Sequence, residues 1–567
     1  AEVNFQAGGY SAEYGGANGG LIMTTTRSGG RQMQIGFEAY TDSWSEPGEE
    51  NFLGSYNYGN SVYVLTAGGP LYGPVRFFAA AQNAFSRTPA SYRGAYTLAD
   101  QYDAALRQTD AHALLSPEEQ AKVGIFDPRL GSAARKVDYT YPGGYVQNTA
   151  DQSWTFNGNM TFDLNPINIR LGGSYSYTTG RQGAGITSGY QVGRTATMVG
   201  DQLVYNSDNI GLANDMRALM TEAENYSASL KLTHLLSQTT FYEVFLNYFG
   251  SFNVLMDPDL QHDVFAYGDS ARNAEFGYQF RADGINPLPV QLFGDNYATF
   301  GAANTGYAYQ KDRYSSISGK LNFVHQIGRT HEIKLGGEAV QYEVRQFDIT
   351  AFTLKSFYRS NPDANPSQQA VNARTNNFGY DQWGALSDGE LDGPRNPVFA
   401  SAYLLDKIEL EDLVINIGVR WDYIDTDTKE FIDPNNVKFD DFGMIDQSPA
   451  NMREVEASST ISPRIGFSFP VTDQTVFYAQ YGKFVQQSRL RDVYLGYATS
   501  ASNIRGGYAI ENPVGFGLKP ETTLQYDFGF RQQIGDFLAF DLGAFYKDIQ
   551  DQIQQQQIPP APGARHL

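Results

Sequence analysis

The sequence contains no cysteine and no apolar run long enough to cross a membrane as a helix. The absence of cysteine is compatible with an oxidising compartment, where a stray thiol is a liability, but does not establish one. A transmembrane helix is excluded, because it would need about 20 consecutive, mostly apolar residues. The mean hydropathy of −0.41 does not exclude a membrane protein, since strands that alternate polar and apolar residues average out.

Basic residues are also scarce, with 41 Lys and Arg against 62 Asp and Glu, giving a formal charge of −21. This balance argues against a nucleic-acid partner, whose binding requires phosphates to be neutralised. Many of the Asp and Glu residues lie in expected loops, for example at 42–50 and 433–446. We expect these acidic residues to keep the loops soluble rather than to bind cations.

Few residues in the sequence suggest a metal-binding or catalytic site. The six histidines are scattered and form no HExxH motif or close cluster, so the sequence predicts no metal site and no cofactor. No catalytic pair can be chosen among the many carboxylates, and we expect no enzymatic activity. The aromatic loops at 265–268 and 297–309 could stack on sugars or peptides, or equally pack against one another.

Aromatic residues and glycine are abundant instead, with 38 Tyr, 37 Phe and 58 Gly. From Met33 onward, apolar and polar residues alternate with a period of two, which predicts strands with two different faces. The clearest case is 153–164, where Trp154 and Phe156 begin one face and Ser153 and Thr155 the other. A turn at Asn165–Asn168 leads into a returning strand. We count about fifteen such strands.

Further short turns are expected near 68–71, 236–238, 327–330, 411–412, 471–473 and 535–536. Between hairpins lie loops of about fifteen to sixty residues, one of them (about 87–151) with a helical piece expected at 116–123. Strands of about ten alternating residues with short turns on one side and long loops on the other are typical of a transmembrane β-barrel. A soluble β-sandwich is the alternative, but it does not need this asymmetry.

A glycine-rich stretch precedes the first strand. It reads Ala7-Gly-Gly-Tyr-Ser-Ala-Glu-Tyr-Gly-Gly-Ala-Asn-Gly-Gly20 and is followed by a β-branched run, Ile22–Thr26, that ends at Ser28-Gly29-Gly30. Paired glycines allow tight turns and close backbone approach, which suits a compact element packed inside something larger. We expect Ile22–Thr26 to form a strand enclosed by the barrel rather than extending it.

This stretch resembles the end of the plug domain of TonB-dependent outer-membrane transporters, particularly the Oar-like group. The matching residues are Gly8, Gly9, Tyr10, Ala12, Glu13, Tyr14, Gly15, Gly19 and Gly20. Later segments at 402–423, 462–467, 518–523 and 545–551 also resemble this family. The resemblance implies an all-β, transmembrane antiparallel barrel of about 22 strands in the whole protein. We therefore expect the sequence to be the interior of a longer chain, with the end of a plug at 1–30, an incomplete barrel at 31–551 and an irregular tail or loop at 552–567.

The function implied by the resemblance is TonB-dependent active transport of a large ligand across the outer membrane of a Gram-negative bacterium. Its partners would be outer-membrane lipid, TonB and the inner-membrane complex that energises it, with a surface lipoprotein or another outer-membrane protein as a further candidate. A structural or assembly component of the cell surface is the alternative. A passive porin is less favoured because of the plug-like start.

Eight charged residues alternate with apolar neighbours and are expected to face the lumen. They are Asp163, Arg170, Lys231, Lys320, Arg420, Asp422, Asp527 and Arg531. Charge facing lipid near the midplane would cost about 2 to 4 kcal/mol for Arg or Lys. Because the chain leaves the plug on the periplasmic side at Gly30, we expect the turns at 165–168, 236–239 and 535–536 to be periplasmic.

Overall fold

The computed structural model describes eleven longer stretches of the chain and several short pieces. The longer stretches are 2–6, 11–16, 20–43, 57–87, 150–182, 219–267, 308–350, 361–389, 392–434, 436–506 and 518–553. The short pieces are 92–93, 96–97, 140–141, 144–145, 196–199, 202–205, 272, 275, 280–281, 288–289, 291–292, 295–296 and 358. The helical piece expected at 116–123 lies outside the described residues.

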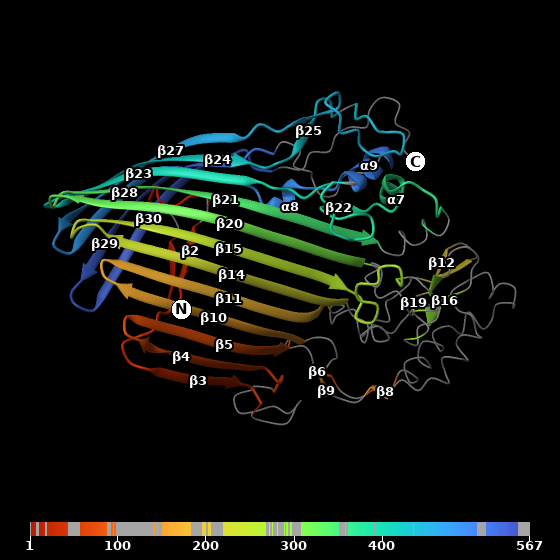
Figure 1. The fold of residues 1–567 in the computed structure, drawn as a ribbon, viewed down its shortest axis with the longest axis horizontal. Coiled ribbons are helices and arrows are strands. Elements are labelled where there is room, and N and C mark those ends of the chain that lie inside the picture. Colours follow the sequence, from red (N-terminus) through yellow and green to blue (C-terminus); the bar gives the residue numbers. More distant parts are fainter. Residues whose placement is uncertain are drawn as a thin grey trace.

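One large antiparallel sheet dominates the fold, and its strands pair in a single path (Figure 1). In order, the strands are β3 (Gln34–Thr41), β4 (Ser61–Tyr72), β5 (Val75–Arg87), β10 (Ala150–Leu164), β11 (Ile167–Gln182), β14 (Leu219–Leu235), β15 (Thr240–Met256), β20 (Ala308–Ile327), β21 (His331–Thr350), β23 (Val398–Leu410), β24 (Leu413–Asp425), β27 (Ser458–Thr472), β28 (Thr475–Gln486), β29 (Glu521–Ile534) and β30 (Leu538–Gln550). These 15 strands confirm the all-β prediction and the expected strand number. Within the described chain, β3 and β30 are not paired with each other, so the sheet is not closed.

Smaller elements accompany the sheet. β1 (Glu2–Gln6) and β2 (Leu21–Thr25) form a separate two-stranded sheet, and β22 (Asn376–Phe378) pairs with β21. The other short pairs are β6 (Tyr92–Arg93) with β9 (Gly144–Tyr145), β7 (Tyr96–Thr97) with β8 (Thr140–Tyr141), β12 (Ala196–Val199) with β13 (Gln202–Tyr205), β16 (Phe280–Arg281) with β17 (Leu288–Pro289), β18 (Gln291–Leu292) with β19 (Asp295–Asn296), and β25 (Lys429–Phe431) with β26 (Met452–Glu454). The helices named among the described residues are α7 (Pro366–Asn372), α8 (Leu490–Val493) and α9 (Tyr497–Gly506). Among the described residues, no helix is both long and apolar enough to cross a membrane.

The expected asymmetry of the connections is present. Short turns gather at one end of the sheet, whereas α7, α9, β22 and β25 lie toward the other end (Figure 1). The predicted turns at 236–238, 327–330, 411–412 and 535–536 fall between the observed strands to within a residue. We call the first side the turn end and the second the loop end.

The turn predicted at 68–71 is wrong. Gly68 and Gly69 are part of β4, where they pair with Phe78 and Phe77. A side-chain carbon added at Gly69 would lie 2.7 Å from Met33 Cα, so this glycine allows a close backbone approach instead. The chain reverses later, at Gly73, whose φ of 53° suits a residue without a side chain. The register shifts between Pro70 and Tyr72, and this irregularity accommodates a proline inside the strand.

The sheet has two chemically different faces. Directly paired residues of antiparallel strands point to the same side, and neighbours along a strand point to opposite sides. Leu171, Leu230 and Leu246 form one row across β11, β14 and β15. Exposed apolar residues continue this side as Trp154, Phe156, Tyr175, Ile317, Leu321, Leu335, Leu404, Ile417, Val419, Trp421, Ile461, Ile465, Phe528 and Leu542. We call this side the apolar face and the opposite side the polar face.

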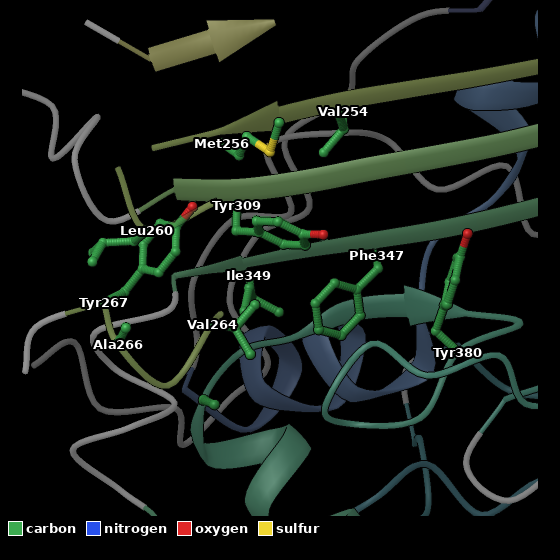
Figure 2. Packing of buried hydrophobic residues seen from close by; sticks show 11 residues of the cluster. Val254, Met256, Leu260, Val264, Ala266, Tyr267, Tyr309, Phe347, Ile349 and Tyr380 are labelled. Atoms are coloured by element: carbon green, nitrogen blue, oxygen red, sulfur yellow. The ribbon is translucent and has the colours of Figure 1, made fainter. Parts of the chain in front are cut away.

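Several strands are longer than the expected ten or so residues, because their loop ends join a hydrophobic cluster. β20 and β21 each span 20 residues. Near their loop ends, Tyr309, Phe347 and Ile349 are buried together with Tyr267 and Tyr380 from the loops (Figure 2). Sequence alternation could not predict this extension, because the stabilising partners lie in distant loops.

Candidate functional site

The N-terminal segment turns sharply between β1 and β2. The two strands pair in register from Glu2 with Thr25 to Gln6 with Leu21. Between them, the Tyr14 amide donates to the Ser11 carbonyl at 3.1 Å. β2 therefore forms at the predicted position and stays outside the large sheet.

Two arginines of the polar face hold this turn by its backbone. Arg420 on β24 donates to the carbonyls of Ala12 at 3.4 Å and Glu13 at 3.3 Å. Arg464 on β27 donates through one nitrogen to the carbonyls of Ser11 and Tyr14. Both guanidinium groups are buried, and such charge-assisted bonds are stronger than neutral ones. We call this contact the turn anchor.

The turn anchor leaves no spare space around the turn. Ala12 is fully buried, and a side-chain carbon added at Gly418 would lie 2.8 Å from its Cβ. A carbon added at Gly15 would lie 2.3 Å from Arg420 Nε. Glycine at position 15 therefore lets the guanidinium approach the turn. Arg420 also donates from Nε to Asp422 at 2.7 Å, which holds the guanidinium in place.

The side chains of the turn make a second set of contacts with the polar face of the large sheet. The ammonium of Lys320 on β20 lies 3.8 Å from a carboxylate oxygen of Glu13 and 5.8 Å from the centre of the Tyr14 ring. The turn is therefore held by cations from three strands, β20, β24 and β27.

A further contact holds the chain after β2. Arg170 donates to the Thr26 carbonyl at 3.0 Å and to its hydroxyl at 2.7 Å. Asn159 donates to the Arg27 carbonyl at 2.8 Å, and Arg76 to the Gly29 carbonyl at 3.0 Å. These three side chains come from β11, β10 and β5, the early part of the sheet. We call this contact the exit anchor.

Glycine is required at the exit anchor. A side-chain carbon added at Gly29 would lie 2.2 Å from the backbone carbonyl oxygen of Phe77, which cannot move aside as a flexible side chain could. A side-chain carbon added at Gly30, the next residue, would have no atom closer than 3.8 Å. The Gly-Gly pair therefore contains one position that needs glycine for close approach and one that has space.

The eight charged residues predicted from alternation share the polar face by register. Arg170 pairs directly with Lys231, and Lys320 with Glu338. Arg170, Lys320 and Arg420 contact the N-terminal segment, as described above. The other five pair with wall residues: Asp163 with Arg76, Lys231 with Glu243, Asp422 with Arg420, Asp527 with Gln525 and Arg531 with Asp541.

Of the predicted plug motif, Ala12, Glu13, Tyr14, Gly15 and Gly20 are described. Gly8, Gly9, Tyr10 and Gly19 lie outside the described residues. Sequence reasoning missed Arg464, Asn159 and Arg76, although all three alternate with residues of the apolar face. The available signal was the alternation that places each of them on the same face of its strand as the other polar residues.

The loops at the loop end fold together over a small core. Residues 361–397, 426–457 and 487–506, as far as they are described, contribute to this loop cap. Its core combines Ala370 and Val371 of α7 with Met444, Ile445 and Met452 of the second loop and Tyr497, Ala498 and Ala501 of α9. The three loops thus form one packed unit.

A buried ion pair within the first loop of the cap contacts the third loop. Arg395 donates two bonds to the Asp392 carboxylate, at 2.7 and 2.8 Å, and its guanidinium carbon lies 5.2 Å from the Tyr497 ring centre. Burial raises the pKa of Asp392, and the adjacent Arg395 opposes that shift. Burial also raises the pKa of Tyr497, to about 12. Among the described residues, no group of three or more His, Asp or Glu side chains is placed to bind a metal.

Comparison with known proteins identifies the fold. The FrpB iron transporter from Neisseria meningitidis, F3-3 variant, is 13% identical with a TM-score of 0.53, and the match covers 98% of this chain and 61% of that chain. The F5-1 variant is 12% identical with a TM-score of 0.51, covering 96% and 60%. At such low identity these matches show the fold alone, and the chain spans about 60% of the length of these structures.

A search of curated proteins finds no match. The family profile described as "TonB dependent receptor-like, beta-barrel" matches residues 222–566, which is more than half of the chain. The two-faced antiparallel sheet agrees with this profile, and the chain therefore belongs to the family of TonB-dependent receptor-like β-barrel proteins.

Proposed function

We propose that this chain forms the wall and the end of the plug of a transporter that imports a large ligand across the outer membrane of a Gram-negative bacterium. TonB and its inner-membrane complex would supply the energy, and no reaction would be catalysed. Family membership and the exposed apolar face support this placement, because a large exposed apolar surface needs lipid or a protein partner.

The polar face then lines the lumen, and residues 1–30 form the end of the plug. This assignment is supported by the position of the turn and exit anchors, which all use side chains of the polar face. Lipid tails would offer these charged groups no hydrogen-bond partner, whereas the plug backbone offers them carbonyl oxygens.

The observation that carries the proposal is the turn anchor. Arg420 and Arg464 hold four consecutive backbone carbonyls, those of Ser11 to Tyr14. Hydrogen bonds to charged groups contribute about 1.5 to 3 kcal/mol each, so the anchor is strong enough to hold a closed state.

The two anchors would have different roles in opening. A pull from the periplasm reaches the turn anchor first, because it precedes β2 in the chain. The exit anchor lies between β2 and the first barrel strand, so it would keep the plug tethered to the wall. Opening would therefore separate Ser11–Tyr14 from β24 and β27 while Thr26–Gly29 stays bound.

The test uses a single cysteine at the buried turn. The chain has no cysteine of its own, so Ala12→Cys provides a unique thiol. In energised cells we expect a small maleimide reagent to label this thiol. Labelling should fall at least about tenfold in cells lacking TonB, which corresponds to about 1.4 kcal/mol in the opening equilibrium. Ile22→Cys is the matched control, because Ile22 is 71% exposed and a thiol there should react in both strains.

Equal labelling of the Ala12→Cys variant with and without TonB would contradict energised opening. Equally weak labelling in both strains would favour the structural or assembly alternative, in which the plug segment stays fixed. Strong labelling of this variant in both strains, at the level of the Ile22→Cys variant, would favour an open pore.

A further inference from the structure

A groove opens on the apolar face where β24 and β27 approach their short turns. It has a volume of about 1000 Å³ and is lined mainly by apolar side chains, including Leu413, Ile415, Ile465, Phe467 and Phe469. Ile415 pairs directly with Phe467, which fixes both side chains on the apolar face. The groove is therefore on the side that, under the proposed function, faces lipid.

Aromatic rings form a firm wall on one side of the groove. The Phe467 and Phe469 rings are stacked 6.5 Å apart, and Phe477 lies 5.4 Å from Phe469. Phe467 and Phe469 nevertheless remain 39% and 37% exposed. Rings held by their neighbours but open on one side offer a ready surface for an apolar chain, with little loss of conformational entropy.

The end of the groove nearest the turns is acidic. Glu411 and Asp412, in the turn between β23 and β24, line it together with Glu409. Glu409 forms an ion pair with Lys407, which offsets its charge. The two exposed carboxylates of the turn would repel a headgroup with net negative charge and attract an ammonium group.

A cation lies next to this acidic end in the chain. Thr330, in the turn between β20 and β21, also lines the groove, and the residue before it is the exposed Arg329. Arg329 itself does not line the groove, so the charge that selects a headgroup comes from the two carboxylates, which favour an ammonium.

We propose that this groove binds a phospholipid whose headgroup carries a free ammonium, of the phosphatidylethanolamine type. An acyl chain would lie along Ile415, Ile465 and Phe467, and the ammonium would contact Glu411 and Asp412. The proposal rests on the placement of the apolar face in the membrane. It adds a defined lipid site at the turn end, on the face of β24 and β27 opposite to the turn anchor.

The experiment measures lipid retained by the purified full chain. Protein reconstituted in bilayer discs with equal amounts of phosphatidylethanolamine and phosphatidylglycerol is transferred to mild detergent, and the bound lipid is counted by native mass spectrometry. We expect a preference for the amino lipid of at least about fivefold, as an ion pair of about 1 kcal/mol would give. Glu411→Gln with Asp412→Asn should abolish the preference, and Ile465→Trp should reduce retention of both lipids.

Asp536→Asn, in the turn between β29 and β30, is the matched control and should leave the preference intact. Equal retention of both lipids by the wild type, or an unchanged preference in the double variant, would overturn the proposal. Displacement of lipid by a basic peptide but no headgroup preference would instead indicate a protein partner. The measurement needs neither uptake nor TonB, so its failure is distinguishable from failure of the import proposal.

Discussion

The guanidinium carbon of Arg464 lies 4.4 Å from the centre of the Phe484 ring, so the arginine is stacked on an aromatic surface while it donates to the N-terminal segment. The stack orients the guanidinium before any hydrogen bond forms, and cation–π contacts of this kind contribute about 0.5 to 2 kcal/mol. The Phe484 ring packs directly against Gly482. A side-chain carbon added at Gly482 would lie 2.7 Å from that ring, so glycine is needed there to leave room for it. The wall is thus built to present Arg464 to the turn.

Replacing this arginine should loosen the plug. Arg464→Gln removes the charge and the stacked group, and the loss of two charge-assisted bonds should favour release of Ser11–Tyr14 by about 3 kcal/mol, or roughly 100-fold. We expect frequent opening events in single-channel recordings of the reconstituted protein. Arg531→Gln is the matched control, because Arg531 is exposed in its pair with Asp541 and contributes little. An opening frequency equal to that of the wild type would mean that the turn anchor does not hold this segment in place.

The two glycines at the exit anchor should respond differently to the same change. Gly29→Ala forces a methyl group into the Phe77 carbonyl and should destabilise the exit anchor by about 1 to 3 kcal/mol. Gly30→Ala meets no close atom and should have little effect. Resistance of the segment 20–30 to proteolysis, compared between the two variants, measures the difference. Equal resistance would show that the close approach at Gly29 does not matter for stability.

Local alternation was sufficient to predict the strands but not the contacts between distant segments. Lys320 and Arg420 could be selected because charged residues stand among apolar neighbours, and both contact the N-terminal segment. Arg464 follows a proline and stands out in the sequence only as part of a family-like phrase. The loop cap could not be predicted, because α9 is weakly amphipathic on its own and is held by Arg395 and Met444 from other loops.

The orientation of the chain can be tested with cysteines at opposite ends of the strands. Asp536→Cys lies in a short turn, and Phe442→Cys lies in the loop between β24 and β27, where Phe442 is 45% exposed. If the turn end is periplasmic, a membrane-impermeant maleimide added to intact cells should label the Phe442→Cys variant and fail to label the Asp536→Cys variant. Broken cells provide the control, since both thiols should then react. Labelling at position 536 in intact cells would reverse the topology.

The loop cap should open at alkaline pH because of its buried tyrosines, Tyr380, Tyr494 and Tyr497. Burial raises the pKa of Tyr497 to about 12, against about 10 for an exposed phenol. The folded cap therefore keeps a proton on Tyr497 that the opened cap releases. The contribution of Tyr497 to the stability of the cap is complete below about pH 10, and about 3 kcal/mol of it is lost as the pH rises toward 12. Proteolysis within the loops of the cap should accelerate over this range. Tyr497→Phe keeps the ring against Arg395 but has no proton to lose, so its acceleration should be smaller, and a variant profile identical to the wild type would exclude Tyr497 as the group responsible.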